Sequence, residues 1–249
     1  MKNISLFLNT SVGLEVARFL IRDISVNIES VFLCGNYPLI DKEISSLFIG
    51  SNTKVYRPEE LDKLDAIFNK CNSISHLICV YWPYLLKKNI FQRAIQTVNF
   101  HPAYLPINRG WYPHVHSILD GSPAGVTLHE INEFADQGAI LAQKKISIPS
   151  SFCAGELYQL LQSEMLSIFV KNWPKIRDYK IIKTEQNESL SNYHKKNEIK
   201  ELDFINIKKP EYKELINILR ARSFGNKGFA YFLDKDGSKI FVNIKLNKA

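Results

Sequence analysis

The sequence predicts an α/β fold: a mainly parallel, twisted sheet flanked by helices, followed by a small C-terminal module of one helix and one β-hairpin. Apolar runs typical of strands alternate with helical patterns up to about residue 95, which indicates βαβ units. Hydrophobic residues make up 45% of the 249 residues, enough for a sizeable core. A helical pattern at residues 211–222 is followed by a hairpin pattern at residues 229–244.

The expected strands are short apolar runs, at residues 4–8, 31–34, 76–82, 97–100, 124–130 and 140–148. The expected helices lie at residues 11–21, 59–71, 154–179 and 211–222. Over 154–179 the apolar residues recur close to every 3.6 positions, a spacing that we interpret as core packing.

Residues 182–200 are polar and are interpreted as a linker. They divide the chain into a main domain over 1–181 and a module over 182–249. In that module, 229–233 and 239–244 predict the two strands of a hairpin, with Asp236-Gly237 as its turn.

The formal net charge is +7, which suits anionic partners such as phosphates. The lysine pairs are scattered, however, at 87–88, 144–145, 195–196 and 208–209. This scatter favours a solvated surface, and no nucleic-acid groove is expected. None of the four cysteines stands at CxxC spacing, so we expect neither a zinc site nor a redox pair. This use of cysteine is typical of a protein in a reducing cytoplasm.

Several classes of protein lose support because their signals are missing. The N-terminal apolar run is too short for a signal peptide, and no stretch reaches about 18 apolar residues, so no membrane span is expected. Neither the GxGxxG dinucleotide fingerprint nor a Walker A loop is present, which argues against nicotinamide, flavin or P-loop chemistry.

The residues that indicate chemistry begin at the end of the strand at 97–100. Asn99 and His101 stand two positions apart, so in extended chain their side chains project to the same side. Open α/β sheets bind ligands at the carboxyl ends of their strands, so we expect both side chains in one cleft. A loop marked by Pro and Gly follows at 104–110, and Asp136 and Gly138 come later.

Each candidate also has a structural interpretation. Asp136 suits an ordinary turn, and Arg109 suits a surface position in a loop. We interpret His129 as a supporting or core histidine. His114 and His116 are expected to face the surface of a short helix.

Four motifs follow one another within about 40 residues: NxHP at 99–102, LPxxRG at 105–110, GVTLH at 125–129 and DxG at 136–138. In this order and spacing they resemble the N10-formyltetrahydrofolate-dependent formyltransferases, which include methionyl-tRNA, glycinamide ribonucleotide and sugar N-formyltransferases. The resemblance implies a Rossmann-like formyltransferase core over 1–181 and an N-formyltransferase activity without a covalent intermediate. It implies that Asn99 and His101 stabilise the oxyanion and that Asp136 helps to remove the amine proton.

The resemblance also implies N10-formyltetrahydrofolate as co-substrate and no metal, so activity is expected to survive a chelator. The pterin is then held largely by backbone groups of two loops, which here contain Tyr81, Trp82, Pro83, Tyr84, Leu85 and Phe134. The alternative for these aromatic residues is core packing.

Three features favour a nucleotide sugar over a tRNA as the acceptor. RGWYP at 109–113 resembles the sugar N-formyltransferases, and residues 193–196 and 219–224 resemble the tails of enzymes acting on dTDP-amino sugars. The tRNA enzymes carry a larger C-terminal β-barrel domain, whereas only a linker, a helix and a hairpin are expected here. The resemblance implies that the substrate is bound by Arg109, Gly110, Trp111, Tyr112, Arg220, Arg222 and Phe224, although a solvated helix face with core aromatics is the alternative for the tail.

We therefore expect formyl transfer to a dTDP-linked amino-dideoxysugar. The favoured substrate is dTDP-4-amino-4,6-dideoxyglucose, and 3-amino sugars are an alternative. UDP or GDP in place of dTDP is also left open by the sequence. The product would serve lipopolysaccharide O-antigen or other surface polysaccharide synthesis. We expect a cytoplasmic homodimer joined through the hairpin. The alternatives are a methionyl-tRNA formyltransferase and a catalytically idle protein that binds sugar nucleotide or folate.

Overall fold

The computed structural model describes residues 1–69, 74–205 and 212–247. Within it the chain forms two compact units that interleave along the sequence. The first contains residues 1–101, 127–143 and 165–186; the second contains 102–126, 144–164 and 187–249. Each unit is described by itself. None of the described helices is long and apolar enough to cross a membrane.

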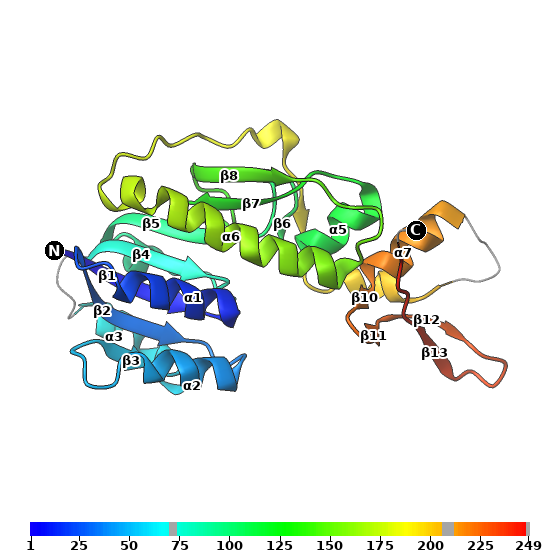
Figure 1. Ribbon diagram of the computed structural model, residues 1–249, viewed down its shortest axis with the longest axis horizontal. Helices are drawn as coiled ribbons and strands as arrows, with labels where there is room; N and C mark the ends of the chain where they lie inside the picture. The colour runs from blue at the N-terminus through cyan, green and yellow to red at the C-terminus, as the bar shows by residue number, and fades with distance from the viewer. Residues whose placement is uncertain (70–73, 206–211, 248–249) are drawn as a thin grey trace. The chain divides into compact units, whose positions relative to one another are not determined.

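A sheet of seven strands, in the order β3-β2-β1-β4-β5-β7-β8, organises the first unit (Figure 1). Its first five strands are parallel, and β7 runs antiparallel to β5. The predicted fold class is thereby confirmed. The strands are β1 (Lys2–Leu8), β2 (Val26–Leu33), β3 (Lys54–Tyr56), β4 (Ile74–Val80), β5 (Ala94–His101), β7 (Ala124–His129) and β8 (Ile140–Ile146).

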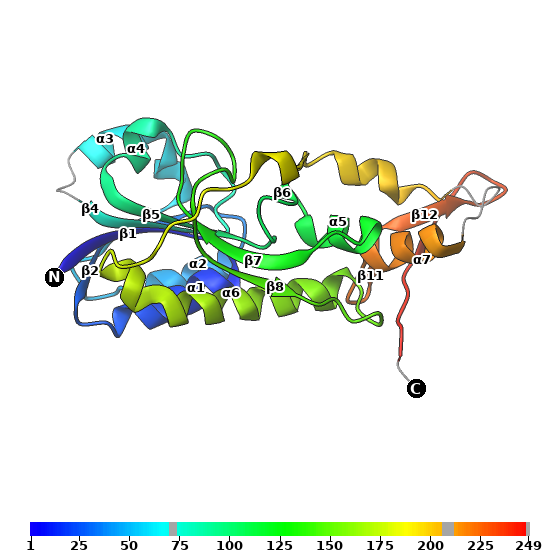
Figure 2. The same ribbon diagram turned by 90° about the horizontal axis from the view of Figure 1, so that it is seen from above.

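Helices cover both faces of this sheet, with α1 and the C-terminal half of α6 on one face and α3 and α4 on the other (Figure 2). The α1 helix begins where the Asn9 side chain accepts a hydrogen bond from the backbone of Thr10, at 3.0 Å. The helices of this unit are α1 (Thr10–Ile21), α2 (Pro38–Ser46), the 3₁₀ turn η1 (Pro58–Lys63), α3 (Leu64–Asn69), α4 (Lys88–Phe91) and the part of α6 (Ala154–Arg177) from Met165 onward.

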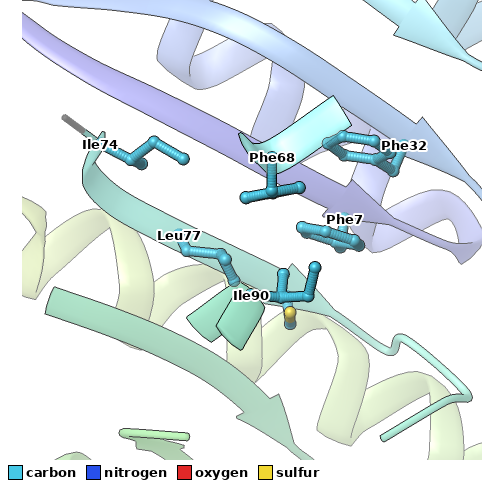
Figure 3. Packing of buried hydrophobic residues seen from close by; sticks show 7 residues of the cluster. Phe7, Phe32, Phe68, Ile74, Leu77 and Ile90 are labelled. Carbon is cyan, nitrogen blue, oxygen red and sulfur yellow. The ribbon is translucent and has the colours of Figure 1, made fainter. Parts of the chain in front are cut away.

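A cluster of buried apolar side chains fills the space between the sheet and α3 and α4 (Figure 3). The rings of Phe7 and Phe32 stack with centroids 4.5 Å apart, and Phe68 packs against both. Trp82 contacts Phe7 edge-on at 5.0 Å, which anchors the loop after β4 to the core. The buried members are Phe7, Phe32, Phe68, Ile74, Leu77, Cys79 and Ile90.

Each predicted strand of the sheet is present, with shifted ends. β4 stops at Val80, two residues early, because Tyr81 has a φ of +52° and leaves the extended conformation. The helix predicted over 59–71 is a 3₁₀ turn followed by α3, since Pro58 opens a tighter turn. Residues 70 and 71 of that prediction lie outside the described residues. The short edge strand β3 was missed.

The second unit contains short elements around two helices. The predicted hairpin is present as β12 and β13, and β6 pairs in parallel with β9 from the predicted linker. The elements are β6 (Arg109–Gly110), α5 (Pro113–Asp120), η2 (Glu188–Leu190), β9 (Tyr193–His194), η3 (Glu198–Asp203), α7 (Tyr212–Ala221), β10 (Ser223–Phe224), β11 (Lys227–Gly228), β12 (Ala230–Leu233) and β13 (Lys239–Val242).

The expectation that His114 and His116 face a helix surface was wrong. Both are buried, at 8% and 7% exposure, because α5 packs against α7 and its histidine rings lie against other rings. His114 packs on Tyr158, and His116 stacks on His194.

Candidate active site

Asn99 and His101 lie at the carboxyl end of β5, where the strand pairs with β7. In the antiparallel register Asn99 faces His129, and His101 faces Thr127. The side chain of His101 is 7% exposed, and Asn99 is half-buried. The predicted spacing of two residues therefore brings an amide and an imidazole to one end of one strand.

His129 fixes the orientation of the Asn99 amide. Its Nδ1 lies 2.7 Å from the backbone oxygen of Glu130, which can only accept a hydrogen bond, so Nδ1 carries the proton. Nε2 then holds a lone pair and accepts from Nδ2 of Asn99 at 3.0 Å. His129 is 2% exposed, which agrees with the prediction of a supporting histidine.

Asp136 completes a group of polar side chains around Asn99 and His101. Its Oδ1 lies 3.4 Å from Nδ1 of His101 and 3.5 Å from Nδ2 of Asn99. Oδ1 is also 3.6 Å from Nε2 of His129, but that nitrogen is an acceptor in the assigned tautomer, so we do not read this contact as an ion pair. The Asp136 side chain is 14% exposed, and the weak screening at such a site strengthens its interactions.

The backbone around Asp136 is held in an unusual conformation. Asp136 has a φ of +57°, and Gln186 donates from Nε2 to the backbone oxygens of Asp136 and Gly138, at 2.9 and 2.7 Å. A Cβ at position 138 would lie 1.8 Å from the backbone oxygen of Glu130. Only glycine fits there, which explains the glycine of the DxG motif.

Gln186 is a site residue that the sequence analysis missed. It stands 50 positions after Asp136 in the stretch interpreted as a linker, and no local pattern marks it. The isolated bridge between Ile140 and Thr184 brings this stretch beside β8.

The loop after β4, predicted to hold the pterin, borders a cavity of about 410 Å³. Trp82, Tyr84 and Leu85 line it, and the Nε1 atom of Trp82 is buried without a hydrogen-bond partner. Neither His101 nor Asp136 is among the residues that line this cavity. Its other lining residues are Cys34, Pro58, Leu61, Asp62, Leu64, Asp65, Leu86, Lys87 and Ile90.

The remaining residues predicted to bind the co-substrate differ in exposure. Phe134 is 62% exposed on the loop before Asp136, while Tyr81 and Pro83 are half-buried. Asn9 donates from Nδ2 to the backbone oxygen of Tyr81 at 2.9 Å, which holds the start of the loop after β4.

In the second unit, Arg109 is buried and paired. Its Nη1 and Nη2 atoms donate to the two carboxylate oxygens of Glu188 at 2.8 and 2.7 Å, and the residue is 3% exposed. The alternative of a surface arginine is therefore wrong. This bidentate pair fixes the turn that carries the RG motif, so the geometry favours a positioning role for Arg109.

The residues after Arg109 are held against β9. Gly110 has a φ of +86°, and a Cβ there would lie 2.4 Å from the backbone oxygen of His194. Trp111 donates its backbone N–H to that oxygen at 3.0 Å, and Nζ of Lys196 lies 4.6 Å above its ring. Tyr112, at a φ of +55°, precedes α5.

Arg220 and Arg222, predicted to hold a diphosphate, have partners within the unit. Arg220 donates to the backbone oxygens of Phe152 and Pro149 at 3.1 and 3.3 Å. Arg222 is buried and donates to Asp203 at 2.5 Å. Phe224 is 38% exposed and lies beside Tyr158. Nucleotide binding by these residues stays a prediction.

Comparison with known proteins identifies the family. Residues 42–172, about half of the chain, match the formyl transferase family. The chain belongs to that family. Residues 198–248 match a second family, described as the N-formyltransferase dimerization C-terminal domain.

Among characterised members, the dTDP-4-amino-4,6-dideoxyglucose formyltransferase of Mycobacterium tuberculosis is 34% identical over 158 residues. This match covers 61% of the chain and spans 65% of the length of the relative.

Two solved structures of N-formyltransferases share the fold. A 4-N-formyltransferase from Francisella tularensis has a TM-score of 0.85 at 23% identity and covers 100% of this chain and 99% of its own. An N-formyltransferase from Helicobacter canadensis, in complex with folinic acid and dTDP-3-aminofucose, has a TM-score of 0.72 at 22% identity and covers 89% and 80%.

Proposed function

We propose that the protein transfers a formyl group from N10-formyltetrahydrofolate to the amine of a dTDP-linked amino-dideoxysugar. The observation that carries the proposal is the convergence of Asn99, His101 and Asp136 at the end of β5. This group supplies hydrogen-bond donors beside a carboxylate, as acyl transfer to an amine requires.

In the proposed reaction the sugar amine attacks the formyl carbon, a new C–N bond forms, and the formyl oxygen becomes an oxyanion. Asn99 donates from Nδ2, and His101 from its ring, to that oxygen. Asp136 accepts the proton that the attacking amine loses, directly or through a water. The oxyanion then collapses, the bond from carbon to N10 of the folate breaks, and N10 takes up a proton.

His129 prepares Asn99 for this step. One Nδ2 hydrogen is bound to His129, which fixes the amide plane and leaves the second hydrogen directed toward the polar group. An amide oriented before the reaction loses little entropy when the oxyanion forms, which is the source of its catalytic effect.

The loop after β4 supports the folate part of the proposal. A flat heterocycle needs apolar walls and a few directed polar groups. Trp82 packs on the core through Phe7 and keeps a buried Nε1 donor without a partner, while Tyr84 and Leu85 are exposed at 55% and 72%. With Phe134, these residues suit the walls of a pterin site, and the co-substrate brings the one-carbon unit itself.

The dTDP-sugar part is supported by the RGWYP motif at 109–113 and by the Mycobacterium relative, which acts on the 4-amino sugar. We favour dTDP-4-amino-4,6-dideoxyglucose over a 3-amino sugar on that similarity. Trp111 and Tyr112 then face the substrate, and Arg109 holds their turn in place.

The proposal extends to the organisation of the protein. Residues 1–181 form the catalytic domain, and 182–249 add the helix and hairpin through which two copies associate. Cysteines without redox spacing fit a cytoplasmic enzyme, and a formylated dTDP-sugar suits surface polysaccharide synthesis such as that of O-antigen.

One assay tests the proposal. The purified chain is incubated with N10-formyltetrahydrofolate and, separately, with dTDP-4-amino-4,6-dideoxyglucose, its dTDP-3-amino relative, a UDP-linked 4-amino sugar and methionyl-tRNA, and products are followed by mass spectrometry. We expect formylation of the dTDP-4-amino sugar at the highest kcat/KM. Formylation of methionyl-tRNA alone would replace the proposal with the tRNA reaction. Binding of dTDP-sugar without any product would indicate an idle binding protein.

A further inference from the structure

The second unit contains another group of polar side chains. None of them belongs to the group of Asn99, His101 and Asp136. His116 comes from α5, His194 from β9 and Glu198 from the start of η3. One ligand atom from each lies within 4.8 Å of the others. His116 stands 78 positions before His194, so the three residues form no local metal-binding motif such as CxxC or HxxxH, and only the fold brings them together.

The two imidazole rings are in direct contact. His116 and His194 stack with centroids 3.4 Å apart and an angle of 8° between their planes. Nδ1 of His194 lies 3.2 Å from Oε2 of Glu198. On its other side, Nε2 of His194 lies 3.1 Å from Oδ1 of Asn108, which orients the ring.

His116 carries an unsatisfied buried atom. The residue is 7% exposed, and its Nε2 has no hydrogen-bond partner. A buried polar atom without a partner costs about 1–3 kcal/mol, so a native site normally supplies one.

The contact between His194 and Glu198 depends on which ring nitrogen of the histidine carries the proton. If Nε2 of His194 donates to Asn108, then Nδ1 presents a lone pair to a carboxylate, and two acceptors face each other. A cation between them removes this conflict. In the other tautomer Nδ1 donates to Glu198 and Nε2 accepts from Nδ2 of Asn192 at 3.2 Å, so a metal must displace the proton on Nδ1.

We propose that His116, His194 and Glu198 bind a divalent transition-metal ion of the zinc type. Two imidazoles and one carboxylate form a donor set that zinc uses, with water in a fourth position, whereas magnesium and calcium prefer oxygen ligands alone. Asn108 supplies the outer hydrogen bond that metal-binding histidines usually make. Because nitrogen lone pairs lie in the ring plane, at least one of the stacked rings rotates when the ion binds.

This ion would join α5 to the segment at 193–198. The backbone oxygen of His194 receives the N–H of Trp111, so the ion would also stiffen the strip formed by Gly110 and Trp111. Its role is structural, and the formyl transfer at Asn99, His101 and Asp136 does not pass through it.

The test is direct metal binding by tag-free full-length protein that has been treated with chelator and dialysed. Cobalt(II) is titrated in while its visible d–d absorption is followed, and zinc is then added in competition with a chromophoric chelator. We expect one ion per chain, and binding weakened at least about 10-fold in His116→Gln, His194→Gln and Glu198→Gln. Zinc at about 100 times its Kd should raise the Tm by about 5–10 °C.

His114→Gln is the matched control, because His114 lies on the same helix, is as buried as His116 and also has an unpartnered ring nitrogen. It should keep metal binding even if it lowers stability. Absence of stoichiometric binding in the wild-type chain overturns the proposal, and so does equal loss in His114→Gln and His116→Gln. Formyl transfer is not a readout, so failure of the proposed function leaves this test intact.

Discussion

Asn99 and His129 face each other across the antiparallel pair of β5 and β7, with Nδ2 of Asn99 3.0 Å from Nε2 of His129. This hydrogen bond makes His129 a positioning residue, since it holds the amide without belonging to the reacting group. We expect His129→Leu to lower kcat at least about 10-fold with a smaller change in KM.

The conservative change His129→Gln separates positioning from packing. A glutamine carbonyl can accept from Asn99 as Nε2 does, so His129→Gln should recover a large part of the kcat lost in His129→Leu. Steady-state kinetics on both variants, with circular dichroism as the check on folding, decide. Equal kcat in the two variants would show that only volume matters at this position.

Removal of the reacting group itself should have a larger effect. Asn99→Ala, His101→Ala and Asp136→Ala should each lower turnover at least about 10²-fold while the chain stays folded, because each removes a donor or acceptor that acts in the transition state. Turnover with saturating co-substrate and Tm values from thermal melts are the measurements. Near-normal turnover in a folded His101→Ala variant contradicts the role given to that residue.

Much of this site was predictable from the sequence. The pair at 99 and 101 needed only the period of a strand and the end of an apolar run, and both positions are as expected. Gln186 and the pairing of Arg109 with Glu188 were not predictable, because each joins residues 50 or more positions apart in a stretch without apolar periodicity. Tertiary packing decides such contacts, and local patterns do not record it.

Tertiary packing also explains why the exposure predicted for His114 and His116 on α5 was wrong. The repeat of histidine at 114 and 116 resembles a polar helix surface, but α7, about 100 residues later, covers that helix. Two-residue strands such as β6 and β9 also carry too few residues for any pattern.

Gly138 provides a test of the backbone around Asp136. Gly138→Ala places a Cβ 1.8 Å from the oxygen of Glu130, so the backbone must shift and carry Asp136 with it. We expect turnover to fall at least about 10-fold and the Tm to fall. Gly50→Ala is the control for backbone strain without a clash, because Gly50 has a positive φ, +78°, and open space around its Cβ position. Activity unchanged in Gly138→Ala would show that the loop relaxes without moving Asp136.

Asp23 should make the stability of the first unit depend on pH. Burial acts to raise the pKa of Asp23, but hydrogen bonds from Ser25, Trp173 and Arg177 outweigh it and lower the pKa to about 2. A carboxylate with a lowered pKa stabilises the fold above its unfolded pKa, near 3.8, and loses this effect as the pH falls toward 2.

Asp23→Asn should therefore cost about 2 kcal/mol at pH 7, and the difference from the wild type should shrink below about pH 4. Urea unfolding at a series of pH values measures both. Asp236→Asn is the control, since that carboxylate is exposed in a turn. A difference that is constant from pH 7 to pH 3 would mean that Asp23 acts through packing.

The hairpin of β12 and β13 should join two copies of the chain. A two-stranded hairpin is marginal alone and needs a partner surface. Here several large apolar side chains remain exposed, with Phe229 at 42%, Leu233 at 46% and Phe241 at 60%, while Tyr231 packs between Phe204 and Phe241. A two-fold contact lets this short element meet its own copy.

We therefore expect a homodimer at micromolar concentration by light scattering, and a monomer for a chain ending at Ser223. Because truncation also removes contacts of Ser223 with Ile244, the full-length variant Phe241→Glu is the cleaner test and should likewise be monomeric. Leu190→Glu is its control, since Leu190 is equally exposed at 60% in the same unit but outside the hairpin. A monomeric wild type contradicts the dimer; a dimer that survives both truncation and Phe241→Glu shows that the hairpin is not its interface.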